Sequence, residues 1–353
     1  MSPVVTGSGV VFTVADPAAE LSGVNLYQEV QRPRIGPAFT RTPDLESWQL
    51  AWPRPDVDRM EYMLELVTEG ESPRLISDPS NRLRAPGPFG DKSVVEWSEY
   101  RAPTWMEGDF ENQGPIVRGS IECRPLRTSL PVMLWSSHGA DERRPLPLLV
   151  AHDGPQYAEF SKLVMLLDRK TTQGTLPPMR AALIGPVERN EIYSASAVYG
   201  RALAHEILPW LSRHAPTPQG RRFRIGVGAS LGALAMLHTH RTYPASFGAL
   251  LLQSGSFFRQ RFDRQEWGFP RFRRISRFIG RVLTADEWMH PIPVTMTCGT
   301  IEENLANNQA VRDALAAQGY HVGLVVNRDG HNWVGWRDTF DPHLVELLQR
   351  TWG

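Results

Sequence analysis

The sequence has few of the features that mark several large classes of protein. Only two cysteines occur, Cys123 and Cys298, too few for a disulfide scaffold or a structural zinc cluster. No stretch approaches about 18 consecutive apolar residues, so no transmembrane helix and no membrane partner are expected. The N-terminal residues lack a basic segment followed by an apolar one. No signal peptide is therefore predicted, and a cytoplasmic location is expected.

An excess of charge of one sign is also missing. The formal net charge is +0 at pH 7, because 38 basic residues balance 38 acidic ones. A nucleic-acid binder usually carries a dominant basic field, so no nucleic-acid partner is expected. Hydrophobic residues make up 41% of the chain and charged residues 22%, which is typical of a globular protein and argues against disorder. A length of 353 residues corresponds to two domains, or to one large domain with an extension.

Residues 1–115 are predicted to form a small β-sandwich domain. Residues 59–67 alternate between polar and apolar side chains, which is typical of a strand with one wet face, and residues 10–14 form a second strand candidate. Segments rich in proline, glycine, asparagine and aspartate separate such strands, and no long helical pattern is present. The polar stretch 108–115 is predicted to link this domain to the rest of the chain.

Residues 116–353 have a different pattern, in which predicted strands and helices alternate. Such alternation predicts an α/β fold with a mostly parallel sheet and helices on both faces. Strands are expected at 130–135, 147–151, 180–184, 223–227, 247–253, 294–298 and 321–326, and helices at 198–211, 231–241, 305–318 and 342–350.

The first chemical signal is a G-x-S-x-G pattern centred on Ser230. A predicted strand runs directly into the pattern and a predicted helix runs directly out of it. A sharp turn of this kind holds a nucleophilic serine exposed, with the start of a helix behind it to favour negative charge. Gly226, Gly228 and Gly232 also form a loose dinucleotide-binding pattern, but the acidic residue which that pattern requires is missing between Gly232 and Phe262. No cofactor or metal is therefore expected.

A serine hydrolase of this type needs an acid and then a histidine further along the chain. Glu302 and Glu303 follow the predicted strand 294–298, and His331 follows the strand 321–326. Loops at the carboxyl ends of parallel strands are where α/β active sites lie. These residues predict a Ser-His-Glu triad in which either glutamate is the acid.

Five segments together resemble the putative-esterase branch of the α/β-hydrolases, which contains enterochelin esterases, esterase-D-like enzymes and mycolyltransferases. The resemblance covers about residues 120–353, and residues 76–97 more loosely resemble the β-sandwich that precedes the hydrolase in enterochelin-esterase-like proteins. It implies that Ser230 is the nucleophile, His331 the general base and Glu302, rather than Glu303, the acid. The matching segments are HDGPQY (152–157), RNEIYS (189–194), GASLGA (228–233), GTIEENLANN (299–308) and DGHNWVGWRD (329–338).

The oxyanion hole departs from the family pattern. The backbone N–H of Leu231, directly after the nucleophile, is the expected first donor. The resemblance places the second donor just after His152-Asp153-Gly154, where this chain has Pro155, which has no N–H. We therefore expect Gln156 to supply the second donor, or the hole to be weaker.

The sequence says less about the substrate, for which a small siderophore-type or aromatic ester is the expectation. Residues 259–281 hold eight arginines, including Arg259 and Arg261, which can attract an anion such as a ferric catecholate or simply form a solvated basic helix. Trp333 and Trp336 lie beside His331 and can stack on an aryl group or pack beneath the loop. Acyl transfer or peptide hydrolysis would use the same machinery, and a non-catalytic ligand-binding protein with this fold is a further alternative. The oligomeric state is not predicted.

Overall fold

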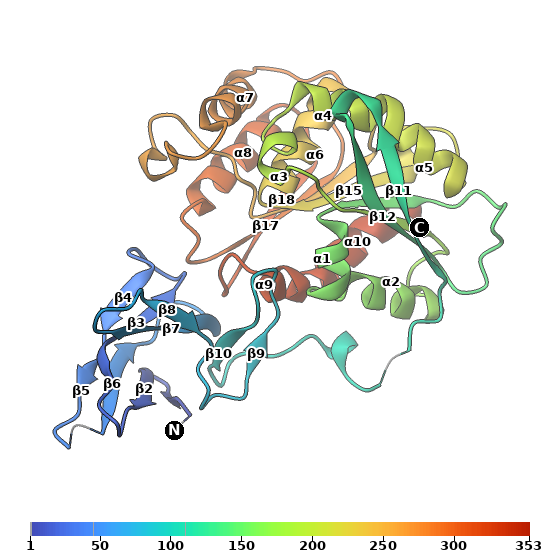
Figure 1. Ribbon diagram of the computed structural model, residues 1–353. Helices are drawn as coiled ribbons and strands as arrows, with labels where there is room; N and C mark the ends of the chain where they lie inside the picture. The colour runs from blue at the N-terminus through green and yellow to red at the C-terminus, as the bar shows by residue number, and fades with distance from the viewer. Residues whose placement is uncertain (1, 45, 110) are drawn as a thin grey trace. The chain divides into compact units, whose positions relative to one another are not determined.

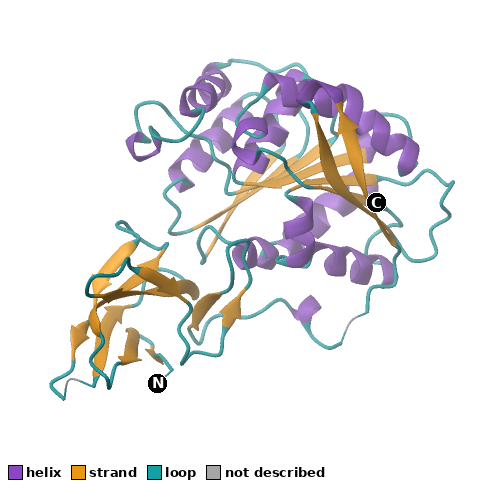
Figure 2. Cartoon of the chain, in the orientation of Figure 1, coloured by secondary structure: helices purple, strands orange, loops and turns teal. Residues whose placement is uncertain are grey.

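The computed structural model describes residues 2–44, 46–109 and 111–353, and the chain divides into two compact units (Figures 1 and 2). The second unit consists of Pro103–Cys298, Glu303–Val326 and Trp336–Gly353. The first unit combines the N-terminal part of the chain with two short segments from its C-terminal third: Met1–Ala102, Gly299–Glu302 and Asn327–Gly335. Phe110, in the predicted link, lies outside the described residues.

The first unit is built on two antiparallel sheets. The alternation seen in the sequence appears in β7, where Met60, Tyr62 and Leu64 are buried. They share one hydrophobic core with Phe12 and Trp52 of the other sheet, which agrees with the predicted sandwich. One sheet has the order β1-β2-β6-β5, and the other β4-β3-β7-β10-β9 with β8 paired to β7. The strands are β1 (Val4–Thr6), β2 (Gly9–Ala15), β3 (Leu21–Gln28), β4 (Ile35–Ala38), β5 (Thr40–Arg41), β6 (Ser47–Pro53), β7 (Arg59–Thr68), β8 (Arg74–Ile76), β9 (Arg84–Ala85) and β10 (Lys92–Glu96).

The second unit is an α/β fold around an eight-stranded sheet, as predicted. The strand order is β11-β12-β14-β13-β15-β16-β17-β18. The β11–β12 and β12–β14 pairs are antiparallel, and β14, β13, β15, β16 and β17 run parallel to one another. The strands are β11 (Ile116–Cys123), β12 (Thr128–Ser136), β13 (Leu148–His152), β14 (Arg180–Ile184), β15 (Arg224–Ala229), β16 (Ala249–Gln253), β17 (Val294–Gly299) and β18 (Val322–Asn327).

Helices cover both faces of this sheet (Figures 1 and 2). One face carries α4 to α8, and the other carries α1, α2 and α10. The single helix predicted at 198–211 is interrupted between α4 and α5 by a π-helical turn, η3 (Leu203–Ile207). The α-helices are α1 (Gly154–Glu159), α2 (Leu163–Thr172), α3 (Arg189–Ile192), α4 (Ala197–Ala202), α5 (Leu208–His214), α6 (Leu231–Thr242), α7 (Phe272–Thr284), α8 (Leu305–Ala317), α9 (Trp333–Asp338) and α10 (Val345–Trp352).

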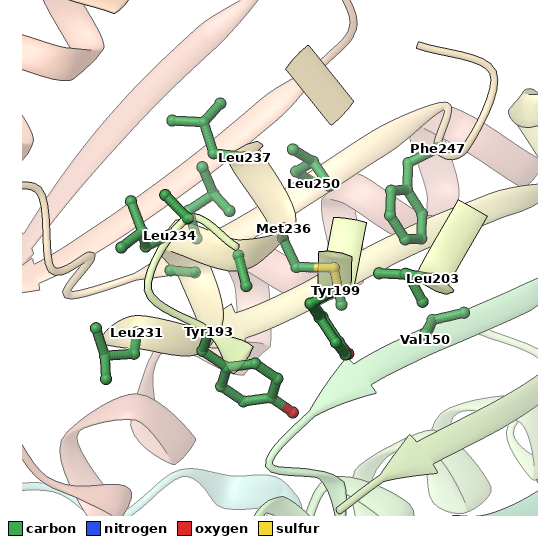
Figure 3. Close-up of a cluster of buried hydrophobic side chains, with 14 of the residues drawn as sticks. Val150, Tyr193, Tyr199, Leu203, Leu231, Leu234, Met236, Leu237, Phe247 and Leu250 are labelled. Atoms are coloured by element: carbon green, nitrogen blue, oxygen red, sulfur yellow. The ribbon is translucent and has the colours of Figure 1, made fainter. Parts of the chain in front are cut away.

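The central helix α6 is buried on all sides. Figure 3 shows Leu234, Met236 and Leu237 of α6 among Phe247 and Leu250, with which they share the main core. Since α6 begins at the residue after Ser230, this packing fixes the turn that carries the serine.

Candidate active site

Ser230 lies in a strained turn between β15 and α6. Its φ of 56° and ψ of −122° are unusual for a residue with a side chain. The turn is tight, because a Cβ atom on Gly228 would lie 2.5 Å from the backbone carbon of Gly232. The Ser230 amide donates to the carbonyl of Gln253 at 2.9 Å, and its Oγ lies 3.0 Å from the Oγ of buried Ser256. This geometry is that of a nucleophile elbow, with a half-buried hydroxyl at the carboxyl end of a central strand.

Glu302 and His331 are in direct contact. The Nδ1 atom of His331 lies 2.7 Å from Oε2 of Glu302, whose other oxygen accepts the Gly299 amide at 2.7 Å. A carboxylate can only accept, so Nδ1 carries a proton, and in the neutral imidazole the lone pair that a base needs is then on Nε2. The Glu302 side chain is 2% exposed and that of His331 is 39% exposed. Glu303 is exposed, so of the two candidate acids it is Glu302 whose carboxylate is buried against the imidazole.

The loops that carry these groups leave neighbouring strands of the sheet. Ser230 follows β15 and Ser256 follows β16, while Glu302 and His331 follow β17 and β18. The strands β15, β16, β17 and β18 are consecutive in the sheet order. The chain thus brings its candidate acid, base and nucleophile to the loops that carry active sites in α/β folds.

The first turns of α6 and α1 offer backbone donors. Leu231 is the first residue of α6, so its N–H has no partner within the helix. In α1, Pro155 is the second residue and Gln156 the third. The first main-chain bond of α1 is from the Tyr157 amide to the carbonyl of Asp153 at 3.0 Å, so the Gln156 N–H also lies ahead of the helical ladder.

Asp153 fixes the start of α1 through an ion pair that sequence reasoning missed. Its two carboxylate oxygens each accept a hydrogen bond of 2.8 Å from the Arg189 guanidinium. Its φ of 50° is left-handed, and its side chain is 3% exposed. Both residues belong to segments that carry the family resemblance, HDGPQY and RNEIYS, so the resemblance marked the two segments but not the pairing between them.

His152, the residue before Asp153, is buried and neutral. Its Nδ1 bonds the carbonyl of Gly232 at 3.0 Å and its Nε2 bonds the Tyr199 hydroxyl at 2.7 Å. The ring also stacks on Tyr193 at 4.4 Å. Burial lowers the pKa of His152 to about 4, so the uncharged imidazole links the end of β13 to α4 and α6 and is not suited to act as a base.

The residues predicted to bind substrate differ in their burial and in their bonding partners. Trp336 is buried and donates to Ser254 Oγ at 2.9 Å, which favours packing over stacking on an aryl group, while Trp333 is half-buried. Arg259 is bonded through Nε to Asn307 and lies 4.2 Å from the Phe262 ring. Arg261 is exposed.

The arginine-rich segment ends in an amphipathic helix, which has an exposed face with Arg273 and Arg277 and a buried apolar face. Helix α7 buries Phe272, Ile275 and Ile279 against the main core. Arg271 and Arg274 form ion pairs with Glu191. A cavity of about 620 Å³ is lined by Glu191, Trp267, Phe269, Arg271, Phe272, Arg273, Arg274 and Arg277. This surface has the cationic and aromatic character that suits an anionic aryl compound.

Residues 2–44, 46–109 and 111–353 contain no helix with the length and apolar character needed to span a membrane. No group of three or more histidine, cysteine, aspartate or glutamate side chains is arranged to hold a metal ion in that part of the chain.

Comparison with known proteins places the chain among esterases. A family model described as "Putative esterase" matches residues 126–347. The iron(III) enterobactin esterase of Dickeya dadantii is 29% identical over 290 residues, which are 75% of this chain and 63% of that protein. The protein of the same name from Escherichia coli O6:H1 is 29% identical over 283 residues, 78% of this chain and 68% of the relative. The chain thus spans less than two thirds of the Dickeya relative.

Solved structures with the same fold cover the whole chain. The enterochelin esterase of Shigella flexneri superposes with a TM-score of 0.80 at 19% identity, covering 100% of this chain and 96% of the other. A ferulic acid esterase superposes on 69% of this chain and 100% of its own, with a TM-score of 0.59 at 17% identity. At such identities the likeness establishes the fold, which confirms the predicted α/β-hydrolase with an N-terminal β domain.

Proposed function

This chain belongs to the putative-esterase family, and from that premise we propose that it is a serine carboxylic ester hydrolase. In this proposal Ser230 is the nucleophile, His331 the general base and Glu302 the acid that orients it. The observation that carries the proposal is the buried Glu302 carboxylate 2.7 Å from Nδ1 of His331, in a chain that also holds Ser230 in an elbow. In a histidine oriented in this way, Nε2 is the ring atom that would accept a proton from a serine hydroxyl.

The chemistry runs through an acyl-enzyme. Ser230 Oγ attacks the ester carbonyl carbon while His331 Nε2 takes the hydroxyl proton. The tetrahedral intermediate then collapses, and His331 returns that proton to the departing alcohol. Water attacks the acyl-enzyme in the same way, giving its proton to His331, and the carboxylic acid leaves as Ser230 regains its hydrogen. Glu302 stabilises the imidazolium that forms in each half of the cycle.

The negative charge on the carbonyl oxygen needs two donors. We assign the first to the Leu231 N–H and the second to the Gln156 N–H, because each precedes the helical hydrogen-bond ladder of its own helix. Pro155 has a φ fixed near −65°, which suits the first turn of a helix and presets the backbone for a donor one residue later. The Asp153–Arg189 pair holds this turn in place.

For the substrate we infer an enterobactin-type or other aromatic ester. Two relatives of this chain are iron(III) enterobactin esterases, and a ferulic acid esterase has the same fold, which supports this inference. The exposed arginines of the 259–281 segment, such as Arg261, Arg273 and Arg277, add positive charge suited to a ferric catecholate. The N-terminal domain, residues 1–115, is proposed as a part of the same enzyme.

The test is a panel of esters assayed on the purified full chain. It contains an aryl acetate, an aliphatic ester, a feruloyl ester and the trilactone enterobactin with and without iron. Ser230→Ala is the control, since it removes only a hydroxyl, and its kcat should fall on the order of 10³-fold or more. We expect the catecholate or aryl esters to have the highest kcat/KM. If no ester is hydrolysed, or if the folded Ser230→Ala protein keeps most of its activity, the proposal is wrong.

A further inference from the structure

A short segment before β7 in the first unit contacts both loops that carry the proposed acid and base. The Thr300 hydroxyl, in the loop that carries the acid, donates to the carbonyl of Asp56 at 2.7 Å. The Asp58 amide donates to the carbonyl of Arg328 at 2.9 Å, and the Arg328 guanidinium bonds the carboxylates of Asp56 and Asp58. The N-terminal β domain therefore holds the two loops through main-chain as well as side-chain bonds.

Arg59, the first residue of β7, makes the deepest of these contacts. Its side chain is 2% exposed, and its Nη1 lies 3.4 Å from Oδ2 of Asp329 and 3.3 Å from Oδ1 of Asn332. Asp329 and Asn332 flank His331 on either side. One guanidinium thus holds the loop both before and after the histidine.

The two residues that Arg59 holds also organise the loop itself. Asp329 Oδ1 accepts 2.7 Å hydrogen bonds from the Gly330 amide and from the Asn332 side chain. Asn332 Oδ1 accepts the Gly335 amide, also at 2.7 Å, at the start of α9. The backbone around the histidine therefore depends on two side chains, and both are bonded to Arg59.

The fit around these groups leaves little room for adjustment. A Cβ atom on Gly299 would lie 2.1 Å from the carbonyl oxygen of Asp329, so the loops of the acid and the base touch at their backbones. Beneath the guanidinium, Glu61 accepts from Nη2 of Arg59 at 2.9 Å. Glu61 is itself 3.6 Å from the Lys92 ammonium. Carboxylates therefore contact the Arg59 guanidinium on two sides, which fixes the orientation of this planar group relative to β7.

We propose that Arg59 is a positioning residue for His331, so that the N-terminal β strands of the first unit help to place the proposed general base. The inference rests on the proposed function, because it assigns Arg59 a part in placing the general base. The histidine side chain is 39% exposed and its Nδ1 is bonded to Glu302, so the position of the imidazole depends on its loop as well as on Glu302. A displacement of about 1 Å of such a group costs up to roughly 100-fold in rate.

The test compares Arg59→Ala with Arg41→Ala in the full chain. Arg41 is a matched control, because it is a partly buried arginine of the same unit whose ion pair, with the buried Asp16 at 2.9 Å, is made within the N-terminal strands and turns. For each variant we would measure kcat and KM on an aryl ester, the free energy of unfolding, and the rate of labelling by a fluorophosphonate. Added guanidinium ion at low, non-denaturing concentration serves as a chemical rescue.

Arg59→Ala is expected to lower kcat and the labelling rate roughly 10- to 100-fold with little change in KM, and guanidinium ion is expected to restore part of the loss. Arg41→Ala is expected to lose stability but to keep its kcat. Equal losses of kcat in the two variants, or an unchanged kcat in Arg59→Ala, would overturn the proposal.

Arg59→Lys keeps the test valid if Arg59→Ala does not fold. Lysine retains the positive charge, but as a point charge it cannot bond Asp329 and Asn332 in the geometry of the fork. A folded Arg59→Lys protein with a reduced kcat supports the proposal, and one with the kcat of the unaltered protein rejects it. If the unaltered chain hydrolyses no ester, or Ser230→Ala is equally active, the proposed function fails instead, so the two failures are distinguishable.

Discussion

At the scale of single residues, sequence reasoning identified the proposed nucleophile and base but only narrowed the acid to two neighbours. Ser230 and His331 stand out because each follows a predicted strand in the order that a hydrolase requires. Glu302 and Glu303 are adjacent, so strand pattern and chain order do not separate them, and the preference for Glu302 came from family resemblance. In the structure it is Glu302 that is buried against the imidazole.

The first prediction separates these two glutamates. Glu302→Gln should slow ester hydrolysis by roughly 10²- to 10⁴-fold, because an amide in place of the carboxylate no longer stabilises the imidazolium or fixes its tautomer. Glu303→Gln is the matched control, with the same chemical change on an exposed neighbour, and should have a much smaller effect. The measurement is kcat for both variants on one aryl ester. The reverse ranking would transfer the role of the acid to Glu303.

Arg59 shows what sequence reasoning could not find at this scale. It was assigned correctly to a strand, but 270 residues separate it from Asp329. A contact across that distance leaves no local pattern in one sequence, because the periodicity of a strand records only which face is buried. The Asp153–Arg189 pair was missed for the same reason, although both residues lie in segments that resemble the family.

At the scale of elements, strands and helices with a regular apolar pattern were predicted well. The buried strands β14 and β16 are almost wholly apolar, as expected of strands covered on both faces. Helices α1 and α2 were not predicted, because both are short and neither begins with a side-chain cap. In α7 the arginines drew attention away from an apolar stripe of Phe272, Ile275, Ile279 and Val282 at helical spacing.

The second prediction concerns the start of α1. Pro155→Ala restores an N–H at the position where the family pattern has a donor, but it should not raise kcat. Our reason is that Gln156 already supplies the second donor and that alanine loosens the first turn of the helix. The measurement is kcat on an aryl ester for the variant and for the unaltered protein. An increase in kcat of roughly tenfold or more would approach the effect of one oxyanion-hole donor. It would show that the oxyanion hole of this chain is incomplete.

At the scale of the whole molecule, the predicted organisation differs from the compact units in one respect. The sequence places a boundary near residue 115, which stays a prediction. The first compact unit ends at Ala102 and takes in Gly299–Glu302 and Asn327–Gly335 as well. A prediction that follows chain order assigns each segment to the domain around it. It cannot foresee that the loops of the proposed acid and base belong to the same compact unit as strands more than 200 residues earlier in the chain. The Arg59 proposal follows from that difference.

The third prediction is a loss of stability in mild acid. Burial lowers the pKa of His152 to about 4, of His238 to about 4 and of His240 to about 3. The unfolded chain binds a proton at these residues below about pH 6.5 while the folded chain does not, so stability falls as the pH falls from about 6.5 toward 4. Each of the three histidines lowers the free energy of unfolding by about 2 kcal/mol between pH 7 and pH 5. Burial raises the pKa of Asp329 to about 6. Protonation of Asp329 below that pH therefore stabilises the folded state and offsets about 1 kcal/mol of the loss.

Urea unfolding at pH 7 and pH 5 measures this loss, and His238→Leu is the informative variant. The His238 ring lies against Phe278 at 4.9 Å, so leucine keeps an apolar contact while it removes one titrating group. The difference in unfolding free energy between the two pH values should shrink by about 2 kcal/mol in His238→Leu. If the unfolding free energy changes equally in both proteins between the two pH values, the pKa of His238 is not lowered in the folded state.

The central claim is that Ser230, activated by His331, is the nucleophile of an ester hydrolase. Its most direct test is covalent labelling with a fluorophosphonate, followed by peptide mass spectrometry and by the labelling rate in His331→Gln. We predict one modified residue, Ser230, no labelling in Ser230→Ala, and a rate at least roughly 10²-fold lower in His331→Gln. A protein that stays unmodified, or a label that persists unchanged when Ser230 is replaced, would contradict the account.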